Sequence, residues 1–272
     1  MANRFRTLVG VSAGLTFLLI LLGVYTAAAG AGLTCNARWP LCDGAVFGLF
    51  PANWPSFIEW FHRLVAMVTG FVILGATVAA WRTGAERRVL AALAVATFFL
   101  PSQIVLGALT VTRYELLILT AHFVTAMTIF TGVVLAAVWT FEGGPGRTRR
   151  AAGVALVALP IVAALTPRLL VVYDASAQVA YYAAGLLAFA AVLATTVWAD
   201  EATSALARVA TGLSTAVLFC LLVVGRQVLS DTAQALALAG AVLAFALTGV
   251  ALWLTARTGA AGPRSGGLPD GD

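Results

Sequence analysis

The amino-acid sequence predicts an all-α, polytopic membrane protein. Its composition is 61% hydrophobic and only 10% charged, and its mean hydropathy is +0.99. Long apolar runs alternate with short loops that carry most of the charged residues. Helices of a water-soluble domain need charged outer faces, whereas helices in a bilayer do not. We therefore expect a bundle of transmembrane helices.

Eight apolar segments approach the length of about 20 residues that a helix needs to cross a bilayer. The first run, Leu8–Ala29, exceeds the roughly 7–15-residue core of a signal peptide, so we expect a retained helix. The fifth segment gives the weakest prediction, because Pro160 interrupts it and Pro167 with Arg168 closes it early. The expected spans are residues 7–29, 56–81, 89–112, 115–140, 151–167, 175–199, 207–229 and 232–256.

The eight segments divide into two sets of four, joined by the polar linker 142–150. A shift of about 118 positions lays Gly107 on Gly225, which indicates a duplicated four-helix unit. The repeat rests more on hydropathy than on matching letters. The expected units are a first half over residues 1–143, a second half over 150–258 and a disordered Gly- and Pro-rich tail over 259–272.

The arginines predict the orientation of the chain in the membrane. All 16 basic residues are Arg; eleven fall on one side of the eight-span arrangement and five at or near the other. Because cytoplasmic loops carry the excess of basic residues, we expect both termini in the cytoplasm. The loop with Cys35 and Cys42 is then extracytoplasmic, in a protein of the plasma membrane. The net charge of +5 reflects this topology, and nucleic acid is not an expected partner.

The chain has two histidines, His62 and His122, and both fall within predicted helices. A titratable ring inside a bilayer is costly, so it indicates a functional site. Each histidine lies six or seven residues past the start of a helix that enters from the same side. At about 1.5 Å per residue, both rings are roughly 9–10 Å deep. The match predicts two axial ligands for one haem iron; the alternative is two unrelated, hydrogen-bonded histidines.

Glu59 precedes His62 by three residues, so the two side chains share one face of a helix. A carboxylate in the outer part of the membrane is a candidate to donate and accept protons. The alternative is a structural ion pair between Glu59 and Arg63, and the sequence leaves both readings open.

Cys35 and Cys42 lie in the long loop after the first helix. On the oxidising side of the membrane they could form a short disulfide that is either structural or redox-active, or remain free thiols. Their spacing is not typical of a zinc site. The third cysteine, Cys220, falls inside a predicted helix, where we expect it to pack.

Further candidates cluster on and after the third predicted helix. Gln103, Gly107 and Thr110 recur on one of its faces, where small residues allow a ligand or a helix to approach closely. Arg113 follows on the outer side and, like Arg63, could meet haem propionates. Simple helix packing and a solvated loop are the alternatives.

In order and placement, these residues resemble the haem A synthase family over residues 1 to about 140. The motifs that carry the resemblance are Cys35…Trp39-Pro40-Leu41-Cys42, Glu59-x-x-His62-Arg63, Gln103-x-x-x-Gly107-x-x-Thr110-Val111 and His122. The resemblance implies oxidation of a ring methyl of haem O to the formyl group of haem A, through two hydroxylations and loss of water. It also implies that His62 and His122 hold this haem, that Glu59 is essential, and that Cys35 and Cys42 form an outer disulfide.

The second half departs from the family pattern, because many members hold a haem b there on a second histidine pair that this chain lacks. We therefore expect no haem b in this half and an electron route elsewhere. Expected partners besides haem O and lipid are a haem O synthase, a terminal oxidase or an electron-transfer protein, and a homo-oligomer is open. The alternative functions are a b-type cytochrome or haem-binding assembly factor without oxidising activity, and a transporter.

Overall fold

The computed structural model describes residues 2–35, 38–39, 42, 50–51, 53–113, 115–141, 143–166, 169–170, 172–199, 204–225 and 231–260. These residues form nine α-helices and one short 3-10 helix, η1. Of the sequence predictions, those on Pro40, Leu41, Pro167, Arg168 and the tail beyond residue 260 lie outside the described residues.

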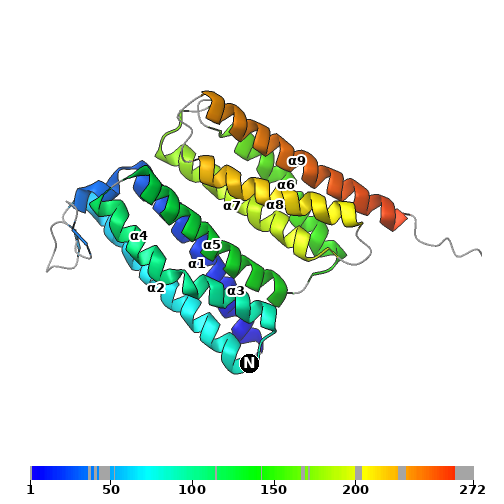
Figure 1. Ribbon diagram of the computed structural model, residues 1–272, viewed down its shortest axis with the longest axis horizontal. Helices are drawn as coiled ribbons and strands as arrows, with labels where there is room; N and C mark the ends of the chain where they lie inside the picture. Colours follow the sequence, from blue (N-terminus) through cyan, green and yellow to red (C-terminus); the bar gives the residue numbers. More distant parts are fainter. Residues whose placement is uncertain are drawn as a thin grey trace, which may run out of the picture.

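The helices of the first half form one bundle in Figure 1. Within it α1 packs on α2 and α5, and α5 also packs on α3 and α4. The first bundle consists of α1 (Ala2–Ala28), η1 (Ala31–Cys35), α2 (Trp54–Thr83), α3 (Arg87–Phe98), α4 (Leu100–Thr112) and α5 (Leu116–Thr140).

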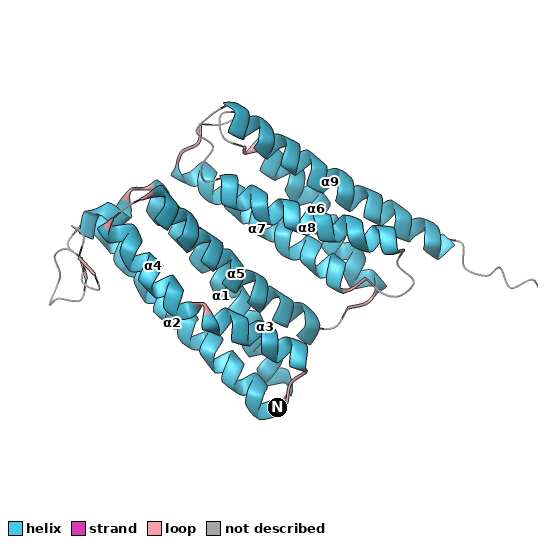
Figure 2. Cartoon of the chain, viewed as in Figure 1, coloured by secondary structure: helices cyan, strands magenta, loops and turns pink. Residues whose placement is uncertain are grey.

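The helices of the second half form a bundle beside the first (Figure 2). In this bundle α6 packs on α7 and α9, and α8 packs on α7 and α9. The two bundles meet mainly where α1 and α5 contact α7. The second bundle consists of α6 (Pro145–Ala164), α7 (Ala175–Val197), α8 (Ala205–Gly225) and α9 (Asp231–Ala260).

Polar residues fix several helix ends. The Asn53 side chain accepts a hydrogen bond from the Ser56 N–H at the start of α2, and Asp174 accepts one from Ala177 at the start of α7. These bonds satisfy backbone donors that the first turn leaves free. Helix α2 ends at Gly84, whose φ of 63° is left-handed and favours glycine.

The third predicted span is one membrane-crossing segment but two helices. Helix α3 ends at Phe98, and α4 begins at Leu100 with Pro101 in its first turn. Proline has no N–H to bond back and its ring clashes with the carbonyl four residues earlier, so a straight helix cannot continue through it. The break at Phe99 sets the direction of α4, which carries Gln103 and Gly107.

Seven helical segments of the described chain are long and apolar enough to cross a membrane: α1, α2, α3 with α4, α5, α7, α8 and α9. The protein is a polytopic membrane protein. Helix α6, over the fifth predicted span, is not among them. Helix α6 begins at Pro145, earlier than predicted, so its first two turns include Arg147, Arg149 and Arg150. Pro160 lies further along the same helix. The predicted count of eight spans therefore remains a prediction.

The outer surface of the bundles is apolar, as a lipid environment requires. Trp81, Phe98 and Leu117 are 70%, 76% and 78% exposed, whereas Phe130 and Tyr181 are almost fully buried. A water-soluble protein would not leave so many large side chains exposed. Within the bundle, small residues let helices approach closely: a Cβ on Gly132 of α5 would lie 2.8 Å from the Ala92 carbonyl oxygen of α3.

Candidate haem site

The His62 ring on α2 lies against Gly23 of α1. A Cβ added to Gly23 would be 3.1 Å from Cε1 and 3.6 Å from Nε2 of His62, and its three nearest neighbours all belong to that ring. Glycine at this position therefore makes room for the imidazole. The His62 Nδ1 atom is buried and has no hydrogen-bond partner among the described residues. A buried polar atom without a hydrogen-bond partner is costly, so the surrounding protein does not meet the hydrogen-bonding needs of His62.

The His122 ring on α5 has a similar environment. A Cβ on Gly107 of α4 would lie 3.3 Å from its Cε1 atom. The Gln103 amide nitrogen, one turn earlier on α4, lies 3.3 Å from His122 Nε2. Because an amide nitrogen donates, Nε2 accepts in this contact and the ring proton resides on Nδ1. The Nε2 lone pair is the one with which an imidazole binds a metal.

His62 on α2 and His122 on α5 lie on helices that both pack on α1. Their pairing in one site stays a prediction. His62 lies eight residues after the start of α2 and His122 six after the start of α5. At about 1.5 Å per residue these positions are about 12 and 9 Å deep. The sequence predicted about 9–10 Å for both rings, so the equal depth of the two histidines stays a prediction.

Glu59 and Arg63 form an ion pair on α2, in which Arg63 Nε donates to Glu59 Oε1 at 2.8 Å. Glu59 is only 5% exposed, and its other oxygen, Oε2, would be 3.7 Å from a Cβ on Gly32 of η1. The Arg63 guanidinium also reaches the Arg38 carbonyl at 3.4–3.5 Å. The alternative considered for Glu59, an ion pair with Arg63, is thus formed. It engages Oε1 and directs Oε2 toward η1.

A disulfide joins Cys35, at the end of η1, to Cys42. Cys35 is fully buried. Nearby, the Ser56 hydroxyl in the first turn of α2 donates to Thr34 Oγ1 at 3.0 Å, and Cys42 Sγ lies 3.6 Å from the Ser56 carbonyl oxygen. The disulfide closes the loop that follows η1, and the contacts of Thr34 and Cys42 with Ser56 hold η1 against the start of α2, one helical turn before Glu59.

Two other sequence candidates lie on or at the end of α4. The Thr110 hydroxyl donates to the Gly107 carbonyl of its own helix at 2.7 Å. Arg113 is exposed at the end of α4. Among the described residues, neither side chain forms a hydrogen bond with a histidine.

Sequence reasoning missed Gly23 and Gly32. Glycine is common in membrane helices and their loops, so neither position carries a signal in a single sequence. Only the packing of α1 and η1 on α2 reveals them.

In the second half, tyrosines occupy the corresponding interior. Tyr181 and Tyr182 of α7 are 0% and 1% exposed. A Cβ on Gly225 of α8 would lie 2.7 Å from the Tyr181 hydroxyl oxygen. Gly225, which the predicted repeat aligns with Gly107, thus faces a phenol ring, whereas Gly107 faces an imidazole. The Tyr182 hydroxyl donates to the Leu222 carbonyl at 3.0 Å, which locks this ring in place.

The described residues contain no group of three or more His, Cys, Asp or Glu that could hold a metal ion. Haem needs fewer protein ligands, because its porphyrin supplies four nitrogens and the protein only the axial positions. Two imidazoles beside glycines, one with a buried unpartnered nitrogen, fit this requirement. The fold defines a polytopic helical membrane protein with two histidines, each of which faces a glycine of a neighbouring helix.

The chain belongs to the COX15–CtaA family of cytochrome oxidase assembly proteins, whose sequence model matches residues 6–251. It is 31% identical over 143 residues to a protein named heme A synthase from Bacillus licheniformis, covering 52% of this chain and 47% of that protein. For the protein of the same name from Lysinibacillus sphaericus, the identity is 36% over 145 residues, covering 52% and 46%.

A third relative has a different name. The protoheme IX farnesyltransferase of Halobacterium salinarum strain R1 is 35% identical over 146 residues, which are 53% of this chain and 31% of that protein. The matched segments thus cover less than half of each of these three relatives.

Proposed function

We propose that the protein is a haem A synthase, which oxidises a ring methyl of haem O to a formyl group. The observation that supports this best is the set of two histidines, in which a glycine faces each ring and a buried carboxylate lies one turn from His62. A protein that only carries haem needs the histidines but not the carboxylate. The names of the Bacillus and Lysinibacillus relatives support the same proposal.

In this proposal His62 and His122 hold the substrate haem through its iron, which supplies the redox chemistry when bound. Gly23 and Gly107 keep each imidazole in the orientation needed for binding. Gln103 donates to His122 Nε2 in the structure, so it must give up this contact when the substrate enters.

Glu59 is the proposed proton carrier. Its Oε1 atom is fixed by Arg63, while Oε2 faces η1. Each of the two successive hydroxylations of the methyl group removes two electrons, which must pass to an electron-transfer partner, and releases protons near the substrate that a fixed carboxylate can accept. Loss of water from the doubly hydroxylated carbon then leaves the formyl group. We place the site near the extracytoplasmic face of the plasma membrane, where the Cys35–Cys42 disulfide closes it.

The test is to express the chain in membranes supplied with haem O, extract the pigments, and identify them by chromatography and mass. We expect haem A from the wild type and unconverted haem O from Glu59→Gln, with haem still bound. Glu86→Gln is a matched control, because Glu86 is an exposed carboxylate paired with Arg88. His62→Ala and His122→Ala should lose the bound haem itself.

The same extracts separate the competing functions. Bound but unmodified haem in the wild type and in both glutamate variants would indicate a haem-binding assembly factor. Because one relative is named a farnesyltransferase, a second experiment supplies the membranes with protohaem and farnesyl diphosphate in place of haem O. Appearance of haem O would then indicate prenyl transfer. Haem A at the wild-type rate from Glu59→Gln would refute the role proposed for this carboxylate.

A further inference from the structure

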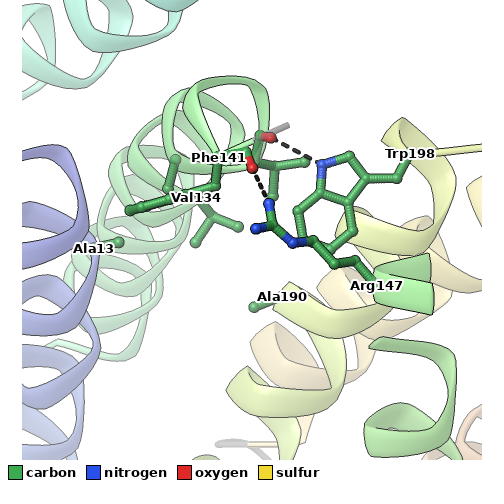
Figure 3. Close-up of a pocket in the computed structure, with 8 residues that line it drawn as sticks. Ala13, Val134, Phe141, Arg147, Ala190 and Trp198 are labelled. Atoms are coloured by element: carbon green, nitrogen blue, oxygen red, sulfur yellow. Dashed lines mark hydrogen bonds between the residues drawn. The ribbon is translucent and has the colours of Figure 1, made fainter. Parts of the chain in front are cut away.

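A cavity of about 400 Å³ lies between the two bundles, far from the histidines. Val134, Val138 and Phe141 at the end of α5 line one wall, and Ala13 of α1 lies beside them. Ala190 and Trp198 of α7 with Arg147 of α6 line the opposite wall, as Figure 3 shows. The volume is in the range of about 300–1,000 Å³ found for ligand sites.

The cavity is polar at its mouth and apolar inside. At the mouth, Arg147 donates to the Phe141 carbonyl and the Trp198 indole donates to the Val138 carbonyl at 2.9 Å. Inside, Val134 lies six residues before the end of α5 and Ala190 seven before the end of α7. At about 1.5 Å per residue, the apolar part therefore extends about 9–10 Å below the helix ends.

The mouth is also positively charged. Among the described residues that line the cavity, Arg147 alone carries a charge. The Arg6 guanidinium lies 5.4 Å from the centre of the Phe141 ring, so a second cation is next to the same opening. Arginine binds phosphate through several N–H donors in one plane, and tryptophan is typical of the membrane interface.

We propose that this cavity binds an anionic phospholipid, with its phosphate at Arg147 and Arg6 and an acyl chain between α1, α5 and α7. A cationic rim beside an open apolar pocket matches a lipid that carries net negative charge at the membrane surface. The lipid would fill the junction of the two bundles at the end opposite the histidines. The proposal does not depend on the haem chemistry.

The test is native mass spectrometry of the purified full chain, loaded with phosphatidylglycerol or phosphatidylcholine in a mild detergent. We expect one tightly retained phosphatidylglycerol and weaker retention of phosphatidylcholine. Arg147→Gln should weaken retention about fivefold, the effect of about 1 kcal/mol per arginine near a lipid surface. Arg149→Gln is the matched control, because Arg149 is exposed on the same helix and does not line the cavity.

A second variant tests the apolar part. Ala190→Phe places a ring inside the cavity and should displace the lipid although Arg147 remains; circular dichroism checks that the variant folds. Equal retention of the two lipids, equal losses in the Arg147 and Arg149 variants, or wild-type retention by folded Ala190→Phe would each overturn the proposal.

Discussion

Replacing Gly23 with alanine should weaken haem binding without destabilising the haem-free protein. The added Cβ would lie 3.1 Å from His62 Cε1, which is tighter than an ordinary contact, so the ring must shift by a few tenths of an ångström. An unliganded ring can tilt to relieve the contact. A ring that must also bind iron cannot, because the ligand direction is fixed by the metal.

The expected magnitude follows from the cost of overpacking, about 1–3 kcal/mol in a well-packed site. Since the shift is small, we expect the lower part of this range, a loss of about tenfold in haem affinity. Gly107→Ala should have a smaller effect, because its Cβ would lie 3.3 Å from His122 Cε1. Alanine also favours a helix over glycine by up to about 1 kcal/mol, so the haem-free variants should melt no lower than the wild type.

The assay is a titration of protohaem into the protein in lipid nanodiscs, followed by the Soret absorbance. Gly14→Ala is the control on the same helix, because a Cβ there meets nothing within 4 Å. The reasoning is refuted if Gly23→Ala binds haem as tightly as Gly14→Ala. A larger effect from Gly107→Ala than from Gly23→Ala would contradict the ranking by contact distance.

Three further predictions concern other parts of the chain. Gln103→Leu should tighten protohaem binding about fivefold, because it removes the hydrogen bond that competes with iron for His122 Nε2, and such a bond contributes about 1 kcal/mol. Weaker binding would mean that Gln103 contacts the haem instead. Replacing both Cys35 and Cys42 with serine should lower the stability by about 2–3 kcal/mol, as expected for a loop this short; unchanged thermal unfolding would contradict this. Hydrogen bonds from the Ala177 N–H and the Ser176 hydroxyl lower the pKa of Asp174. The ionised Asp174 cap therefore stabilises α7 fully above the usual carboxyl pKa of about 4. This stabilisation is lost as the pH falls through the lowered pKa. Asp174→Asn should remove this acid dependence from the melting temperature while keeping a cap.

The sequence was sufficient to predict the class of fold. Composition alone implies membrane helices, and α2, α5 and α7 begin within two residues of their predicted starts. The extent of α6 was predicted less well, because Pro145 can start a helix as readily as it ends one. The break before Pro101 was not predicted, since the apolar pattern runs through it.

The histidines and the carboxylate could be picked out because polar residues are rare within the apolar runs. Arg63, Gln103 and Gly107 were also picked out, whereas Gly23 and the contact between Gln103 and His122 were not. Gly23 looks like any glycine of a membrane helix, and the contact of Gln103 with His122 depends on how α4 turns after Phe99. The cavity at Arg147 was also invisible, because its walls come from α1, α5, α6 and α7.

The Phe123 ring, which follows His122 on α5, packs at 5.4 Å against Tyr182 in the second bundle. Lipid contacts do not favour any one rotation of an apolar helix about its own axis. Contacts with neighbouring helices therefore set the rotation of α5. A tyrosine tied to the Leu222 carbonyl is a rigid neighbour of this kind. The half without histidines thus adds a rigid contact to the helix that carries His122. Removing the second bundle should loosen the orientation of His122, although α1, α3 and α4 still pack on α5.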